Sequence, residues 1–164
     1  MLKSKVLSRE LPWNRKTGGV LMLLVFLPNI LSMVNLTTPG GVKHHTFQVA
    51  IFLAASLLGP LGGLLSGLVG SLFSALTLSN PYLMIGNGIL GFLTGWFLRR
   101  GIRTLFAVWM AFCLQLLWLV PTDYFLAGLS VSFIQNLVLM LFLSNTLWAV
   151  VAARLSEPLR RWLP

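Results

Sequence analysis

The chain has 164 residues, of which 57% are hydrophobic and 9% are charged, whereas an ordinary soluble domain carries about 25% charged residues. This composition excludes a water-soluble globular domain, because polar side chains cannot cover the apolar surface of such a chain. The net charge of +9 comes from bases in short breaks between apolar runs, a pattern typical of membrane topology and attraction to anionic headgroups, and no basic face for nucleic acid exists.

The N-terminal residues 1–17 form a basic polar segment that we expect on the cytoplasmic side. An apolar run follows at 18–36 and is long enough to cross a bilayer at about 1.5 Å per residue. Pro28 inside this run predicts a kink. The proline and glycine residues at 37–43 then predict a turn before the next run.

Five more apolar runs follow, separated by breaks at glycine, proline and arginine residues. The second run of the chain is short for a crossing, so its topology needs separate support. A basic cytoplasmic tail is predicted at 154–164, which makes 18–153 the transmembrane domain. The five runs cover 44–58, 61–78, 82–98, 104–120 and 125–153.

The distribution of basic residues decides whether the second run crosses. With six crossings and a cytoplasmic N-terminus, the bases of 1–17, 99–103 and 154–164 all lie inside, and Lys43 alone lies outside. Without the second crossing, the arginines at 99–103 would lie outside, against the preference of short cytoplasmic loops for Lys and Arg. We therefore predict an all-α, multi-pass protein of the cell membrane with six transmembrane helices and both termini in the cytoplasm.

Small side chains recur every four residues in GPLGGLLSGLVGSLFSAL and form one stripe along a helix, which another helix can approach closely. The fourth run repeats the pattern. Close packing within the bundle is as good an interpretation of these stripes as any mechanistic role. The predicted helix-packing residues are Gly59, Gly63, Gly67, Ser71, Ala75, Gly91 and Gly95.

Amide side chains lie in one layer, roughly 4 to 12 Å below the predicted outer end of each helix but the third. Amides in lipid need hydrogen-bond partners, so they should face the interior of the bundle. Two interpretations stay open: glue between helices, or a polar pocket open to the outside in which amides and aromatics bind an organic solute. The predicted substrate-binding residues are His45, Gln48, Tyr82, Asn87, Gln115, Trp118, Asp123, Gln135 and Asn136.

Catalysis is not expected, because the predicted spans contain no acidic residue for carboxylate chemistry or a proton relay. No cofactor is expected either. A self-sufficient small secondary transporter or channel is an alternative, although charged coupling residues and an inverted repeat are not apparent. A purely structural role is a further alternative, in which the amide layer serves as glue.

Three features resemble the substrate-binding S components of energy-coupling factor (ECF) transporters. They are the PGG loop before a short second helix, the Gly-Pro break that enters a glycine-striped helix, and NPYLMIGNGILGFLTGWFLRRG as the fourth helix. The resemblance spans 18–153 and is densest at 39–103. The first helix departs from the family, because it offers Gly18 and Gly19 where many members carry alanines four apart for docking.

The resemblance implies a subunit that captures a vitamin-like micronutrient at the outer face of the membrane. A transmembrane coupling subunit and two cytoplasmic ATPases would then power uptake, and the chain itself has no GxxxxGK[ST] phosphate loop. Metal-ion members typically begin Met-His, whereas this chain begins Met1-Leu2-Lys3, which argues against a metal ion. A variant metal site at His44 and His45 stays the alternative. The nearly uncharged polar layer favours a neutral or weakly cationic solute.

Overall fold

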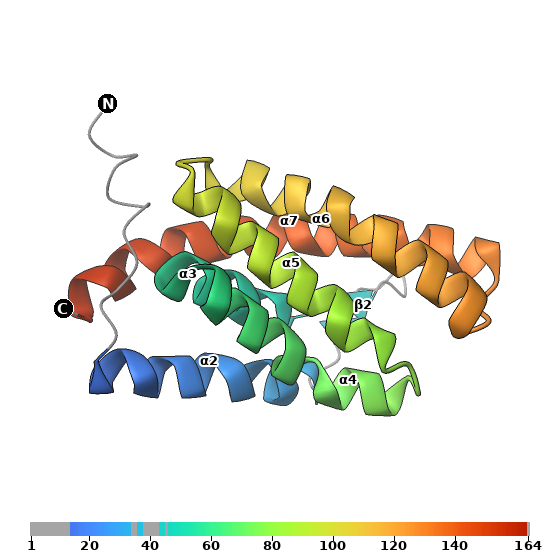
Figure 1. The fold of residues 1–164 in the computed structure, drawn as a ribbon, viewed down its shortest axis with the longest axis horizontal. Coiled ribbons are helices and arrows are strands. Elements are labelled where there is room, and N and C mark those ends of the chain that lie inside the picture. Colours follow the sequence, from blue (N-terminus) through green and yellow to red (C-terminus); the bar gives the residue numbers. More distant parts are fainter. Residues whose placement is uncertain (1–13, 34–35, 38–42, 45, 164) are drawn as a thin grey trace.

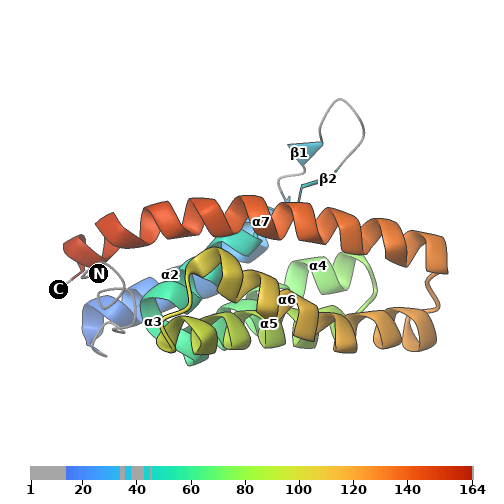
Figure 2. The same ribbon diagram turned by 90° about the horizontal axis from the view of Figure 1, so that it is seen from above.

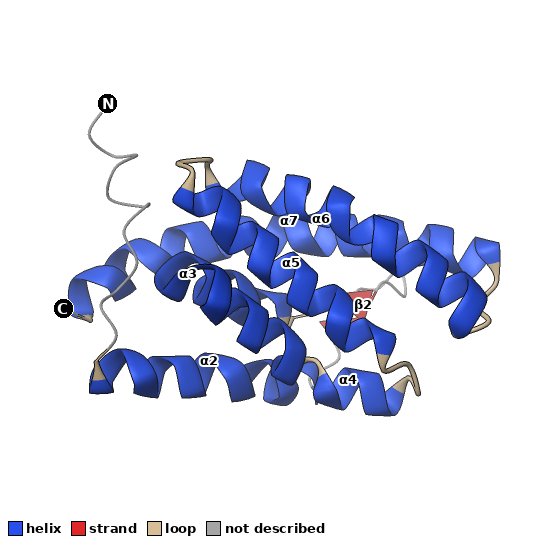
Figure 3. Cartoon of the chain, viewed as in Figure 1, coloured by secondary structure: helices blue, strands red, loops and turns tan. Residues whose placement is uncertain are grey.

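The computed structural model describes residues 14–33, 36–37, 43–44 and 46–163, which form one elongated helical bundle (Figure 1). A small antiparallel pairing of two-residue strands, in which Leu36 pairs with His44, precedes the helix that begins at Gln48 (Figure 3). The predicted all-α class is confirmed. The elements are α2 (Arg15–Met33), β1 (Leu36–Thr37), β2 (Lys43–His44), α3 (Gln48–Gly70), α4 (Leu72–Thr77), α5 (Tyr82–Arg99), α6 (Thr104–Pro121), the π-helical η1 (Thr122–Leu126) and α7 (Val131–Trp162).

Four helical segments are long and apolar enough to cross a membrane: Arg15–Met33, Gln48–Thr77, Thr104–Leu126 and Val131–Trp162. The 18-residue α5 packs against both α3 and α6. The number of crossings and the orientation therefore stay predictions. The interior of the bundle is formed by α3. In the segment Gln48–Thr77, 78% of an apolar 18-residue stretch is buried, against 22% to 33% of such a stretch in each of the other three segments.

The chain reverses direction inside α3. Gly59 has φ +73° and ψ −159°, a conformation that residues with a Cβ rarely adopt. A Cβ placed on Gly63 would lie 3.0 Å from the Cβ of Ala55, whereas residues eight apart in a straight helix are separated by about 12 Å. The break predicted at Gly59-Pro60 is thus the turn of a helical hairpin, whose arms are 48–58 and 60–70 and lie antiparallel (Figure 1).

The second arm of α3 and helix α5 approach each other at glycines. A Cβ on Gly63 would lie 2.6 Å from the carbonyl carbon of Gly91, and a Cβ on Gly95 would lie 2.6 Å from the nitrogen of Pro60. These distances leave no room for a side chain, so the contact is between backbones. The predicted packing residues Gly59, Gly63, Gly67, Ser71, Ala75, Gly91 and Gly95 are all buried.

Polar contacts hold helix α2 against the second arm of α3. The Nδ2 of Asn29 donates to the carbonyl of Val69 at 2.9 Å, and its Oδ1 accepts from the N–H of Phe73 at 2.8 Å. The hydroxyl of Ser66 donates to the carbonyl of Leu24 at 2.6 Å. Asn29 therefore satisfies backbone groups at the break between α3 and α4, which is the helix-to-helix role weighed for the amides.

Helix α7 is longer than predicted. It continues as a helix beyond residue 153, the predicted end of the last span, and ends at Trp162. Ser156 and Leu163 are buried, so the continuation is packed against the bundle and is more than a solvated tail. The start also differs: residues 122–126 continue α6 as η1, and α7 begins at Val131.

The two ends of the bundle differ in charge. The start of α2, the α5–α6 connection and the end of α7 lie together at one end, whereas α4 and η1 lie toward the other (Figures 1 and 2). We call the first the arginine end. Bases on these three segments, among the described residues, are Arg15, Lys16, Arg99, Arg100, Arg103, Arg154, Arg160 and Arg161.

Candidate functional site

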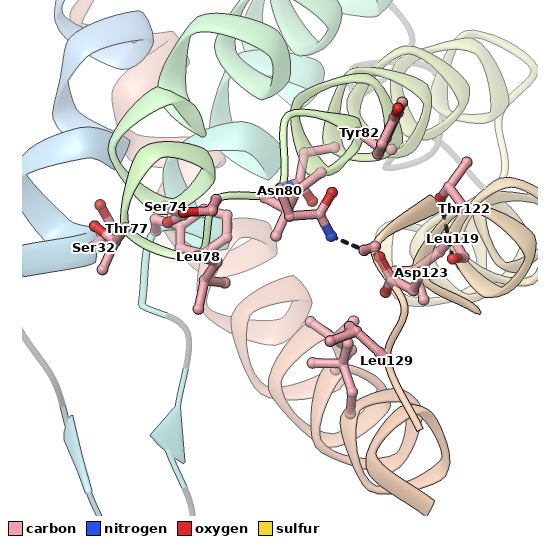
Figure 4. Close-up of a pocket in the computed structure, with 18 of the residues that line it drawn as sticks. Ser32, Ser74, Thr77, Leu78, Asn80, Tyr82, Leu119, Thr122, Asp123 and Leu129 are labelled. Atoms are coloured by element: carbon pink, nitrogen blue, oxygen red, sulfur yellow. Dashed lines mark hydrogen bonds between the residues drawn. The ribbon is translucent and has the colours of Figure 1, made fainter. Parts of the chain in front are cut away.

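A cavity of about 560 Å³ lies away from the arginine end, between α4, α5, α6, η1 and α7. Its volume falls within the range of about 300 to 1,000 Å³ that small-molecule sites occupy. Most of its lining is apolar, and Phe133, Leu137 and Leu141 form one face of α7 toward it. Its polar lining residues include Ser32, Ser74, Thr77, Asn80, Thr122 and Asp123, which Figure 4 labels. Thr46, Ser79, Asn87 and Gln115 also line it.

Two amides from neighbouring helices meet in the cavity wall. The Nε2 of Gln115 on α6 is 3.4 Å from the Oδ1 of Asn87 on α5, and the Nδ2 of Asn87 donates to the hydroxyl of Ser71 at 2.8 Å. That hydroxyl donates to the carbonyl of Gly67 at 2.7 Å. The buried Oε1 of Gln115 has no hydrogen-bond partner among the described residues. This end of the cavity thus offers an acceptor.

A second pair of polar side chains, Asn80 and Asp123, lies elsewhere in the cavity wall. The Nδ2 of Asn80, in the turn between α4 and α5, donates to the Oδ1 of Asp123 on η1 at 2.8 Å (Figure 4). Both side chains are buried, at 6% and 5% exposure. The Oδ1 of Asn80 also lacks a partner within the described chain. The pair therefore presents a carboxylate and a free amide carbonyl.

Aromatic side chains also form part of the cavity wall. The indole nitrogen of Trp118 donates to the carbonyl of Tyr82 at 3.1 Å, which fixes the ring against the start of α5. The ring lies beside Gly86: a Cβ there would be in van der Waals contact with the Cδ1 of Trp118, at 3.4 Å. Phe47, Phe73 and Phe133 also line the cavity. Flat apolar rings fit such walls.

The structure brings together five of the nine predicted binding residues. Tyr82, Asn87, Gln115, Trp118 and Asp123 all line the cavity. They come from α5, from α6 and from η1.

Three others lie elsewhere. Gln48 is buried, but its Oε1 accepts from the hydroxyl of Ser144 at 2.8 Å and it does not line the cavity. Gln135 and Asn136 are exposed, so the expectation that they face the interior is wrong. The reason is rotation: the face of α7 toward the cavity carries Phe133 and Leu137, and the amides between them point elsewhere.

The histidines cannot be compared with the cavity. His45 lies outside the described residues, and His44 is described only as part of β2. Among the described residues, no group of three or more His, Cys, Asp or Glu side chains is placed to hold a metal ion.

Asn80 and Thr122 are lining residues that sequence reasoning missed. Asn80 precedes Pro81 in a turn-forming pair, which predicts an exposed loop. In the structure the turn residues on both sides of Asn80 are exposed, whereas Asn80 itself is buried and its N–H donates to the carbonyl of Ala75 at 2.9 Å. The Asn-Pro pattern predicts the turn, but it does not predict that Asn80 is buried.

Comparison with known proteins identifies the family. Residues 17–158 match the family model described as the ECF-type riboflavin transporter, S component. No curated protein and no solved structure matches the chain. The match covers most of the chain and agrees with the resemblance in the glycine-rich helices. The chain therefore belongs to the S components of ECF-type riboflavin transporters.

Proposed function

We propose that this subunit binds riboflavin in the cavity and captures it from the outer face of the cell membrane. A transmembrane coupling subunit and two cytoplasmic ATPases then drive its release inside. The family is one of substrate-binding transport subunits and not of enzymes. One observation carries the proposal. Two amide side chains whose carbonyls have no hydrogen-bond partner among the described residues line the same cavity as several aromatic side chains.

The chemistry of the cavity complements a flavin. A buried acceptor without a partner costs about 1 to 3 kcal/mol, which a ligand N–H or O–H would offset. The carbonyls of Gln115 and Asn80 are two such acceptors. Riboflavin brings an imide N–H on a flat ring and hydroxyls on its ribityl chain, and the ring fits between Trp118 and the phenylalanines.

The distribution of charge supports the proposed orientation. Bases gather at the arginine end, which we assign to the cytoplasm because short cytoplasmic segments are rich in Lys and Arg. The cavity then lies toward the outer face. The hairpin in α3 supports the shared side of these bases, since its arms run in opposite directions and return the chain to the end away from them before α5 begins.

Thermal unfolding of the purified chain in detergent tests the binding step. Riboflavin at a hundred times its Kd should stabilise the protein by about 2.7 kcal/mol, and quenching of flavin fluorescence gives the Kd directly. Uptake into liposomes should require the coupling subunit and both ATPases. Absence of stabilisation by riboflavin overturns the proposed substrate, and uptake by this chain alone overturns the proposed dependence on partners.

A further inference from the structure

We propose that the Asn80–Asp123 pair binds the hydroxylated side chain of the flavin and excludes flavins that carry a phosphate on it. This inference rests on the proposed function, because it assigns the orientation of the ligand in the same cavity. It makes Asp123 a specificity-determining residue for the unphosphorylated vitamin, and Asn80 the residue that positions its carboxylate.

The cavity has two chemically different ends. Gln115 and Asn87 form an amide end, and Asn80 and Asp123 form a carboxylate end. Eight residues separate Gln115 from Asp123 along α6 and η1, which corresponds to about 12 Å at the helical rise per residue. Trp118 lies between them on the same helix and lines the cavity. A ligand with a flat ring and a polar tail therefore meets different partners at its two ends.

The amide end suits the imide edge of the ring. A glutamine side chain carries a donor and an acceptor side by side, and an imide presents the complementary pair. The unpartnered Oε1 of Gln115 is placed to accept from a ring N–H. The hydroxylated chain then falls at the carboxylate end.

The carboxylate end suits hydroxyls. Hydrogen bonds from hydroxyls to a carboxylate are roughly twice as strong as those between neutral groups. Asp123 is buried, and its Oδ1 is held by the amide of Asn80 at 2.8 Å. The free Oδ1 of Asn80 adds a second acceptor beside it. Both accept hydrogen bonds, and ribityl hydroxyls donate them.

The same end repels phosphate. Asp123 is the one charged side chain among the described lining residues, and these include no Lys or Arg to offset it. A phosphate on the flavin side chain would bring a second negative charge into a buried site next to this carboxylate. Like charges at close range in a site of low dielectric disfavour each other strongly. Riboflavin fits where its phosphate ester does not.

The experiment compares three ligands on the purified full-length protein in detergent. Riboflavin carries the hydroxylated chain, lumiflavin has a methyl group in its place, and flavin mononucleotide (FMN) carries a phosphate on it. Asp123→Asn removes the charge and keeps the shape. Glu157→Gln is the matched control, because it makes the same change at an exposed acid on α7. Binding is read from flavin fluorescence.

We expect the wild-type protein to bind FMN at least about tenfold more weakly than riboflavin. Asp123→Asn should weaken riboflavin about tenfold, change lumiflavin by less than about threefold, and improve FMN relative to riboflavin at least about tenfold. Glu157→Gln should change none of these values. Asn80→Ala should also weaken riboflavin more than lumiflavin.

Two results would overturn this inference. Equal losses of riboflavin and lumiflavin in Asp123→Asn would mean that the carboxylate does not contact the side chain. Equal binding of riboflavin and FMN by the wild-type protein would contradict the exclusion of phosphate without requiring that any variant fold. Failure of the wild-type protein to bind riboflavin, in contrast, overturns the proposed function itself.

Discussion

The guanidinium of Arg160 donates a hydrogen bond to the backbone carbonyl of Ser56, in the first arm of the α3 hairpin. In an unbroken helix this carbonyl would accept from the N–H of the fourth residue after it, but that residue is Pro60, which has none. The cationic end of α7 thus caps a helix C-terminus that proline has left open, a favourable place for positive charge.

Loss of this cap should destabilise the bundle. Arg160→Ala leaves a carbonyl at the hairpin turn without its donor, so we expect the free energy of unfolding to fall by about 1 to 3 kcal/mol. Thermal unfolding in detergent measures the change. Arg161→Ala removes the same charge from an exposed neighbour and should have an effect of less than about 0.5 kcal/mol. Equal effects would show that charge alone, and not the cap, is responsible.

A methyl group at the α3–α5 contact should disturb the packing. In Gly63→Ala the new Cβ would lie 2.6 Å from a backbone carbon of Gly91, so the helices must separate, at an expected cost of about 1 to 3 kcal/mol in unfolding free energy. Gly19→Ala is the control, because nothing lies within 4 Å of its Cβ position. That control should be neutral or stabilising by up to about 1 kcal/mol, since alanine favours a helix. A Gly63→Ala protein as stable as the control would refute the close contact.

Gln115→Ala should weaken flavin binding about tenfold, because it removes the free acceptor at the amide end of the cavity. Gln135→Ala makes the same change on an exposed face of α7 and should leave the Kd within about twofold. Titration of flavin fluorescence against each protein gives both values. A loss of affinity in Gln135→Ala equal to that in Gln115→Ala would count against this cavity as the site.

Replacement of the aromatic wall is a separate test. Trp118→Ala should cost about tenfold or more in flavin affinity, since it removes the ring that the N–H bond to Tyr82 orients. Trp118→Phe should recover most of the loss if stacking dominates. Trp162→Ala, at a tryptophan 78% exposed near the end of α7, is the control. The partial quenching of flavin fluorescence that tryptophan causes should disappear in Trp118→Ala and persist in the control.

Position along each helix was predictable from the sequence, and rotation about each helix axis was not. Asn87 and Gln115 were predicted from their depth alone, and both line the cavity. Gln135 has a comparable depth on α7 but is exposed. In a soluble protein the polar face of a helix marks the solvent side, but in a bilayer the outward face of a helix is expected to be apolar, so the same rule does not place the polar residues of α7. The rotation of α7 is set by packing against α3 and α6, which the sequence does not show directly.

Breaks in the chain were predicted best where the backbone itself requires them. The reversal at Gly59 follows from a glycine conformation and a proline that lacks an N–H, both readable from the residues. The burial of Asn80 was not readable, because an Asn-Pro turn forms equally well in solvent. Its role depends on Asp123, which is distant in sequence and close only in the folded chain.

The hairpin in α3 also has a consequence for how the protein enters its membrane. Its first arm, 48–58, is about 16 Å long at the helical rise, roughly half of the apolar thickness of a bilayer. An arm of this length has no stable position among lipids by itself, and nearly all of its residues are buried in the finished bundle. We therefore expect the two arms to enter the bilayer together, as one unit, before the later helices enclose them.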